Sequence, residues 1–235
     1  MKIYAATVKG IGKTYSEDRI LIENVVLEDT VQTLEMEKMP IIGVCDGVGG
    51  NAGGALAAEF LCRNAYRYLS DDPENGAKQL AAALLEYARG FSQERYMAST
   101  MTMLLPSQNV IVHVGNTRVW RMIRGCLRQI TSDHTTRQIL LQQNRMDAAD
   151  AVPPNELSGC MGGGSPQFSA WIEVLPMPSG DLVLTSDGIH DTLSQDEVEL
   201  LLLAGVDMQE NIENIVRIAA EKGSKDDRSI VVIQQ

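Results

Sequence analysis

Short apolar stretches that stop at acidic residues constrain the fold of this chain more than any other feature. The sequence reads IIGVCDGVGG at 41–50, DLVLTSDGIHD at 181–191 and GSKDDRSIVVI at 223–233. Short apolar runs bounded by turn residues are typical of buried strands. With the early pair Glu17–Asp18 in KTYSEDRI, four separate regions offer carboxylates. We therefore expect folding to bring these side chains together at the ends of strands.

Composition limits the classes of protein to consider. The chain has 235 residues, 44% of them hydrophobic, and a formal net charge of −11. This length and composition predict a single domain over 1–235 with a sizeable core. The acidic balance argues against nucleic acid as a partner, because such binding requires neutralisation of phosphates. Neither a signal peptide nor an apolar run of the ~20 residues that span a bilayer is evident, so we expect a cytoplasmic protein without a membrane partner.

Four cysteines are present, without the CxxC spacing of zinc sites. We interpret Cys45 and Cys62 as buried thiols, which fits a reducing compartment.

Hydrophobic periodicity gives a mixed pattern of helices and strands. Helical stripes are expected at 54–69, 74–94, 195–204 and 208–221. Strands are expected at 1–8, 20–26, 41–45, 99–105, 110–114, 118–123, 127–130, 169–176, 181–187 and 229–235. We interpret the run from 99 to 130 as an antiparallel meander, and 169–187 as a hairpin around Met177–Gly180. The pattern predicts one α+β domain in which helix pairs cover antiparallel sheets.

A long polar segment separates the expected meander from the hairpin. Residues 131–168 contain one helical piece, TRQILLQQN, and the run GCMGGG, and otherwise have no regular pattern. A segment this long in a compact domain is usually functional. We expect it to be a lid or flap.

The carboxylates have a chemistry in common. Asp46 follows an apolar strand and precedes glycines, so its carboxylate and the Gly47 carbonyl can both face one cation. Asp187 repeats this arrangement, and Asp226 precedes the final strand. Each motif alone is more simply a turn, and Asp191 is interpretable as a helix N-cap. Converging carboxylates need a cation to offset their repulsion, and ligand sets made only of oxygen suit Mg²⁺ or Mn²⁺.

Other catalytic signatures are missing. Neither the G-x-S-x-G elbow nor a C-x5-R loop occurs, so no Ser or Cys nucleophile stands in a convincing setting. Two divalent cations would instead polarise a phosphoryl group and lower the pKa of a shared water.

The order of these motifs resembles that of the metal-dependent protein phosphatases of type 2C. KTYSEDRI is similar to the first motif of that family, VCDGVGG to its Asp-Gly-x-Gly-Gly motif, and ASTMTMLL to the strands that follow. HVGNTRVWRMIRGCLRQITSDHT is similar to the Gly-Asp-Ser-Arg strand and its Thr-x-Asp-His close. VLTSDGIHDTLS and SKDDRSIVVI resemble the two last motifs. The resemblance covers nearly the whole chain.

The resemblance implies a four-layer α-β-β-α sandwich with two central antiparallel sheets and a binuclear Mn²⁺ or Mg²⁺ centre. Carried over by position, Asp46 bridges both ions, the Gly47 carbonyl binds one, and Asp187 and Asp226 bind the other. Glu17 and Asp18 would hold metal-bound waters, and 131–168 would be the flap beside the site.

The chain departs from the family pattern at several positions. Lys13 stands where an Arg grips the substrate phosphate, and a lysine offers charge without a bidentate fork. Asn116 replaces an Asp that helps to hold a third ion, so we expect two ions. Asp227 replaces an Asn, and Val48 stands where a His or Met is frequent.

Two of the three histidines have two possible roles each. His134 is either a proton donor or, as we prefer, a turn residue at the start of the flap. His190 is either close to the cations or at the surface. His113, in an alternating strand, is expected to be structural, and Met97, Met101 and Met103 are expected to fill the core.

The resemblance implies hydrolysis of phosphoserine and phosphothreonine in proteins, by a chain of the bacterial stand-alone type that opposes a Ser/Thr kinase. The alternative is a pseudophosphatase that binds phosphoproteins without turnover, suggested by Lys13 and Asn116. The intact Asp46, Asp187 and Asp226 favour the enzyme.

Overall fold

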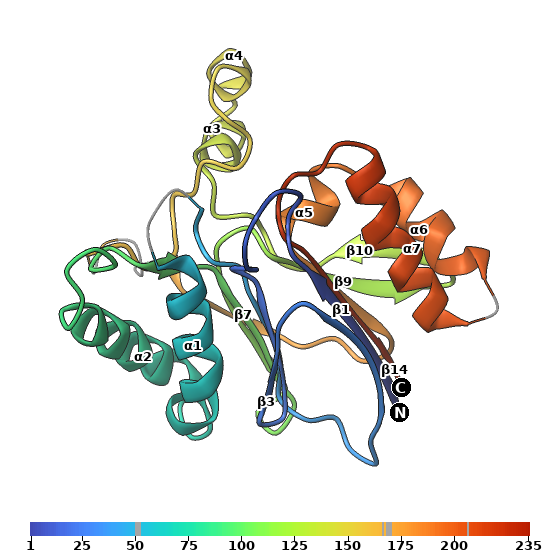
Figure 1. Cartoon of the computed structure of the whole chain (residues 1–235), viewed down its shortest axis with the longest axis horizontal. Coiled ribbons are helices and arrows are strands. Elements are labelled where there is room, and N and C mark those ends of the chain that lie inside the picture. Colours follow the sequence, from blue (N-terminus) through green and yellow to red (C-terminus); the bar gives the residue numbers. More distant parts are fainter. Residues whose placement is uncertain (50–52, 166, 168–170, 206) are drawn as a thin grey trace.

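A computed structural model describes residues 1–49, 53–165, 167, 171–205 and 207–235. Two six-stranded antiparallel sheets form the centre of the molecule (Figure 1). The first has the order β10 (Cys126–Gln129), β9 (Arg118–Ile123), β13 (Leu182–Thr185), β14 (Arg228–Gln234), β1 (Lys2–Val8) and β4 (Thr30–Glu35). The second has the order β12 (Glu173–Pro176), β8 (Val110–Val114), β7 (Met101–Leu105), β5 (Ile42–Cys45), β2 (Arg19–Ile22) and β3 (Val25–Leu27).

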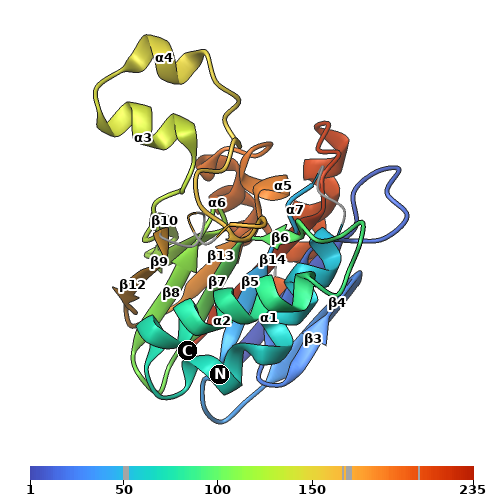
Figure 2. The ribbon, with the colours of Figure 1, turned by 90° about the vertical axis from the view of Figure 1, so that its left-hand side faces the viewer.

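Helices cover the outer face of each sheet. α1 (Gly54–Leu69) and α2 (Pro73–Ala88) lie on the second sheet, and α6 (Gln195–Ala204) and α7 (Met208–Glu221) lie on the first (Figures 1 and 2). The result is the expected four-layer α-β-β-α sandwich. α1, α6 and α7 have the bounds that their apolar stripes predict.

Strand alternation explains why the sandwich has three apolar layers. In β14, Ile230 and Val232 face the helices of their own sheet, whereas Val231 and Ile233 face the other sheet. β1 alternates in the same way. Strands buried on both faces read as continuous apolar runs, which is the pattern that the sequence shows. The expected core methionines, Met97, Met101 and Met103, are fully buried, as are the thiols of Cys45 and Cys62.

Two expected local pairings are wrong. The segments around 169–176 and 181–187 do not form a hairpin, because β12 pairs with β8 in one sheet and β13 pairs with β9 and β14 in the other. Residues 168–170 of that segment lie outside the described residues. The meander is likewise split, since β7 and β8 belong to one sheet and β9 and β10 to the other. The chain crosses between the sheets at Gly115–Thr117, where Gly115 has φ 111°.

Several element bounds also differ from expectation. The second helix ends at Ala88 rather than near 94, because Arg89 N–H turns back to the carbonyls of Glu86 and Tyr87. The strand expected at 20–26 is two strands, separated at Glu23 with φ 59°. β4, along the edge of the first sheet, was not expected from the sequence.

The segment 131–165 projects beside the sheets in Figure 2. It holds α3 (Thr136–Gln142), α4 (Met146–Asp150) and β11 (Met161–Gly162), so it has more regular structure than expected. β11 pairs with β6 (Ala98–Ser99), which ties the end of the segment to the second sheet. Helix α5 (Asp187–His190) is short and begins two residues after β13 ends. None of the described helices combines the length and apolar character needed to cross a bilayer.

Candidate active site

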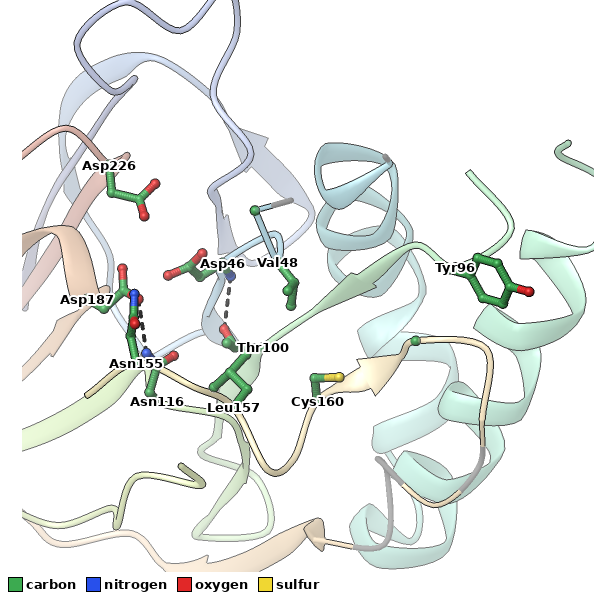
Figure 3. Close-up of a pocket in the computed structure, with 12 residues that line it drawn as sticks. Asp46, Val48, Tyr96, Thr100, Asn116, Asn155, Leu157, Cys160, Asp187 and Asp226 are labelled. Carbon is green, nitrogen blue, oxygen red and sulfur yellow. Dashed lines mark hydrogen bonds between the residues drawn. The ribbon is translucent and has the colours of Figure 1, made fainter. Parts of the chain in front are cut away.

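The predicted carboxylates meet in an open cavity of about 620 Å³ at one end of the two sheets. Its lining includes Asp46, Thr100, Asn116, Asp187 and Asp226. In Figure 3, Asp46 and Asp187 lie close together and Asp226 lies above them. The ends of β5, β13 and the turn before β14 supply these three side chains, so strands from both sheets build one site.

Asp46 is fixed through its backbone. Its N–H donates to the Thr100 hydroxyl at 3.0 Å, and its carbonyl accepts from Thr100 N–H at 2.8 Å and from Ser99 Oγ at 2.9 Å. These bonds join the end of β5 to the two residues that precede β7. They leave the Asp46 carboxylate free to face the cavity.

Gly47 permits a close approach of three chain segments. A Cβ atom at this position would lie 2.5 Å from the Gly54 carbonyl carbon and 2.8 Å from the Glu17 carbonyl oxygen. Gly47 N–H donates to that Glu17 oxygen at 3.2 Å. The glycine therefore lets the Glu17 segment and the start of α1 pack directly against the Asp46 turn.

Asp187 begins α5 and is held from both sides. Asn116 Nδ2 donates to its Oδ2 at 3.0 Å, and the Asp46 carboxyl lies within hydrogen-bonding reach. Asn116 itself is buried, in the crossing between the sheets. The backbone of the next residue, Gly188, packs against the Asp227 carbonyl, which a Cβ atom would approach to 1.9 Å.

The carboxylates disturb one another's titration. Burial, and then the charges of Asp18 and Asp187, raise the pKa of Asp46 well above its usual range. Burial and the charges of Asp226 and Asp191 raise the pKa of Asp187 to about 6, although the bond from Asn116 acts in the opposite direction. The cluster therefore favours a proton or a cation between these side chains.

Asp18 lies behind this cluster. Its Oδ2 accepts from Ser229 Oγ at 2.6 Å, whereas its buried Oδ1 has no hydrogen-bond partner among the described residues. Burial, and then the charge of Asp227, raise the pKa of Asp18 to about 7. A buried carboxylate oxygen without a donor fits a site that also holds a cation and its waters.

Lys13 binds carboxylates in this structure. Its Nζ lies 2.6 Å from Asp226 Oδ1, 2.9 Å from Asp227 Oδ2 and 3.4 Å from Glu17 Oε2. Asp227 is buried and also accepts from the backbone N–H groups of Gly10 and Glu17, both at 2.7 Å. Asp227 thus ties the loop before β2 to the start of β14, and Lys13 extends that tie to Asp226.

This arrangement bears on cation binding. In the described part of the chain, no three His, Cys, Asp or Glu side chains are grouped closely enough to hold a metal ion. Asp46 and Asp187 already share one location, but Asp226 is paired with Lys13. The oxygen donors and the orphaned Asp18 oxygen fit Mn²⁺ or Mg²⁺. Before both oxygens of the Asp226 carboxylate can bind a cation, this carboxylate must leave the Lys13 ammonium group.

The remaining predicted residues have structural surroundings. His113 is fully buried, and its Nε2 lies 3.0 Å from the Ser132 carbonyl, as expected for a structural residue. The His134 ring lies tilted beside it, 4.7 Å between ring centroids, and accepts from Gly115 N–H at 3.2 Å. His190 Nδ1 contacts Thr185 at 2.8 Å. Asp191 follows the last residue of α5, so its interpretation as an N-cap is wrong.

Sequence reasoning did not single out two groups that organise the site. Thr100 binds the Asp46 backbone and shares a 2.8 Å hydrogen bond with Thr117, and Ser229 binds Asp18. Thr100 lies just before β7, which pairs with the strand that ends at Asp46. Ser229 lies at the start of β14, just after Asp226 and Asp227. That position is the signal by which they could have been found.

Comparisons with known proteins show similarity to bacterial protein phosphatases. No protein-family model matches the chain. The "Serine/threonine phosphatase stp" of Listeria innocua is 26% identical over 222 residues, covering 85% of this chain and 86% of the relative. "Protein phosphatase PhpP" of Streptococcus pneumoniae strain D39 is 25% identical over 209 residues, covering 82% and 85%.

Solved structures share the fold. Phosphatase Stp1 of Staphylococcus aureus superposes with a TM-score of 0.79 at 20% identity, covering 99% of this chain and 94% of that one. The catalytic domain of the phosphatase PstP, in complex with two manganese ions, gives 0.72 at 19% identity, covering 99% and 98%.

The sandwich of this chain is the fold of these solved Ser/Thr phosphatases. Over most of its length the chain is similar to bacterial Ser/Thr protein phosphatases such as these two relatives.

Proposed function

We propose that this chain hydrolyses phosphoserine and phosphothreonine in proteins with two Mn²⁺ or Mg²⁺ ions, held by Asp46, the Gly47 carbonyl, Asp187 and Asp226. The convergence of Asp46, Asp187 and Asp226 on one open cavity, where Asp46 and Asp187 lie close together (Figure 3), carries this proposal. Two carboxylates in contact need a positive charge, and oxygen donors select hard cations. When bound, such ions polarise a phosphoryl group and lower the pKa of water.

The protein's own groups prepare the site for this chemistry. Asn116 donates to Asp187 Oδ2 and orients that carboxylate without adding charge. Ser229 fixes Asp18, whose free oxygen and Glu17 can orient water behind the cluster. A neutral Asn116 in place of an acid favours two ions rather than three.

Lys13 is the proposed contact for the substrate phosphate. Its ammonium group is part exposed and lies beside the cavity, on Asp226. An arriving phosphate dianion competes with the carboxylates for this charge. Lysine offers a point charge rather than a bidentate fork, so we expect a weaker hold on phosphate than arginine would give.

We also propose the setting in which the chain acts. Its substrates are phosphoproteins, and a Ser/Thr kinase supplies them. Cys45, Cys62 and Cys126 are free thiols, which fits the reducing cytoplasm. We propose further that 1–235 acts as a single domain, in which residues 131–168 are the flap beside the cavity; Asn155 and Leu157 of that segment line it.

A second candidate is a phosphoprotein-binding module without turnover. The observation in its favour is the Lys13 contact that occupies Asp226. The two functions differ in one measurable property, because only the enzyme releases phosphate.

Phosphate release from p-nitrophenyl phosphate and from a phosphothreonine peptide tests the proposal, with Mn²⁺, with Mg²⁺ and with EDTA. Asp187→Asn is the test variant. Asp181→Asn, at the other end of the same strand, is the matched control; among the described residues its carboxylate accepts from Gln235 N–H. We expect metal-dependent release in wild type and control, and none in Asp187→Asn. A folded wild-type protein that binds the peptide but releases no phosphate would establish the binding module instead.

A further inference from the structure

A second cavity of about 550 Å³ adjoins the catalytic cavity. Its lining includes Arg89, Phe91, Arg95 and Gly164, and Tyr96 lines both cavities. In Figure 3, Tyr96 lies on the far side of the catalytic cavity from Asp187. The two cavities therefore meet at the Tyr96 ring. We name the second cavity the arginine groove.

The arginine groove has a fixed base. Its loop, residues 89–97, starts where α2 ends and returns to the sheet at Met97, which is fully buried. Met97 N–H donates to the Glu94 carbonyl at 2.8 Å, and Gly163 N–H donates to the Met97 carbonyl at 3.0 Å. The loop is thereby joined to the end of the flap.

Tyr96 forms the ridge between the two cavities. Its ring packs on Gly164, where a Cβ atom would lie 2.5 Å from the ring carbon Cδ1. Half of the Tyr96 residue surface remains exposed, at 50%. Gly164 has φ 76°, so a glycine suits this position on conformational grounds as well.

Arg95 provides a positive charge that the protein itself leaves available. Its guanidinium lies over the Tyr96 ring, 4.6 Å from the centroid. Within the described residues, Arg95 forms no ion pair with a carboxylate. Arg89, at the same groove, pairs with Glu86 at 2.6 Å. The chain has a net charge of −11. Beside its acidic catalytic cavity, Arg95 therefore provides a local positive charge on an otherwise largely negative protein.

We propose that the arginine groove binds an acidic residue that flanks the phosphorylated residue of a substrate protein. This inference rests on the proposed function and adds a substrate preference to it. With the phosphate at the carboxylate cavity, the substrate chain extends over the Tyr96 ridge, and a nearby Asp or Glu side chain meets Arg95. Charge complementarity favours this occupant, because a carboxylate elsewhere on the surface meets a largely acidic protein.

Phosphothreonine peptides test the proposal, with a single Glu walked through the positions on either side of the phosphothreonine. The value of kcat/KM is compared with that for p-nitrophenyl phosphate, which is too small to reach Arg95. We expect at least one Glu position to raise kcat/KM in wild type. Exposed ion pairs are weak, so we expect that gain to fall about threefold in Arg95→Ala and about tenfold in Arg95→Glu. Arg95→Lys should retain most of it.

Control variants distinguish the groove from a general charge effect. Arg67, on α1, lies over the Tyr68 ring at 5.4 Å and is not part of either cavity. Arg67→Glu should leave the Glu preference unchanged. A Lys walked through the same positions should instead be preferred by Arg95→Glu.

The outcomes separate the two proposals. Hydrolysis of neither p-nitrophenyl phosphate nor any peptide by wild type would overturn the proposed function, and the groove proposal with it. Normal hydrolysis of both, with no Glu preference or with a preference that Arg95→Glu retains, would overturn the groove proposal alone.

Discussion

Replacing Lys13 by Met removes a charge while retaining most of the side-chain volume. In this structure its Nζ joins Asp226, Asp227 and Glu17, and its side chain is 27% exposed. The variant therefore leaves three carboxylates without their shared counter-ion. We expect the metal-free variant to be less stable than metal-free wild type. Mn²⁺ should raise the stability of the variant by more than it raises that of wild type.

The size of the effect follows from the contacts. A charged hydrogen bond to buried Asp227 contributes ~1.5–3 kcal/mol. The contact with Asp226, whose side chain is 48% exposed, adds at most ~1 kcal/mol because solvent screens it. Backbone N–H groups of Gly10 and Glu17 still hold Asp227, which places the net loss at about 2 kcal/mol. For a chain of this length, that lowers Tm by about 4–8 °C.

The affinity for Mn²⁺ should rise in the same variant. In wild type, Asp226 must leave Lys13 before it can bind a cation, whereas in Lys13→Met it is already free. Relief of about 1 kcal/mol tightens Mn²⁺ binding about fivefold.

Thermal unfolding and titration calorimetry with Mn²⁺ measure both effects. Lys9→Met is the matched control, since Lys9 pairs only with the exposed Asp29, at 3.6 Å. An unchanged Tm without metal, together with unchanged Mn²⁺ affinity, would refute the assignment of Lys13 as the counter-ion of this cluster.

Three further predictions concern single positions. Asn116→Asp places a second carboxylate against Asp187, so the metal-free protein should lose about 2 kcal/mol of stability and regain it with Mn²⁺ in denaturant titrations; equal loss with metal would contradict this reasoning. Burial lowers the pKa of His113 to about 3, so unfolding binds a proton as the pH falls from 6.5 towards 3, and stability should fall by up to ~1.4 kcal/mol per pH unit. His113→Gln should flatten that dependence relative to wild type, and parallel curves would disprove the assignment. Gly188→Ala brings Cβ to 1.9 Å from the Asp227 carbonyl oxygen. Its free energy of unfolding should therefore fall by more than the ~1–3 kcal/mol that overpacking typically costs, and an unchanged denaturation midpoint would contradict the close packing.

Local patterns predicted the helices of this fold well. The stripe from Gly54 to Leu69 gave both ends of α1, because its apolar residues recur at helical spacing and bury one face. The second helix was predicted too long. Its pattern continues through Phe91, but the backbone turns at Arg89 and forms the loop that carries Arg95 and Tyr96.

The sequence predicted the positions of the strands better than it predicted which strands pair. β8 and β9 were placed correctly, yet they belong to different sheets. Strands buried on both faces have no polar side to indicate which sheet they join. Proximity along the chain favoured a meander, whereas burial on both faces of each strand is satisfied only by the sandwich.

The site was predictable to the extent that each residue ends a strand. Asp46, Asp187 and Asp226 are visible in sequence for that reason, and they line one cavity. The partners of Lys13 were not visible, since Asp226 and Asp227 lie more than two hundred residues away along the chain. The pairing of β1 with β14 brings these two segments together.

The most direct test of the central claim is the number and position of Mn²⁺ ions bound by wild type and by Asp46→Asn. Calorimetry would give the stoichiometry, and anomalous scattering from crystals grown with Mn²⁺ would give the positions. The account predicts two ions per chain in wild type, with Asp46 between them, and loss of both ions in the variant. Binding of no ion at Asp46 and Asp187, or the same two ions in Asp46→Asn, would contradict it.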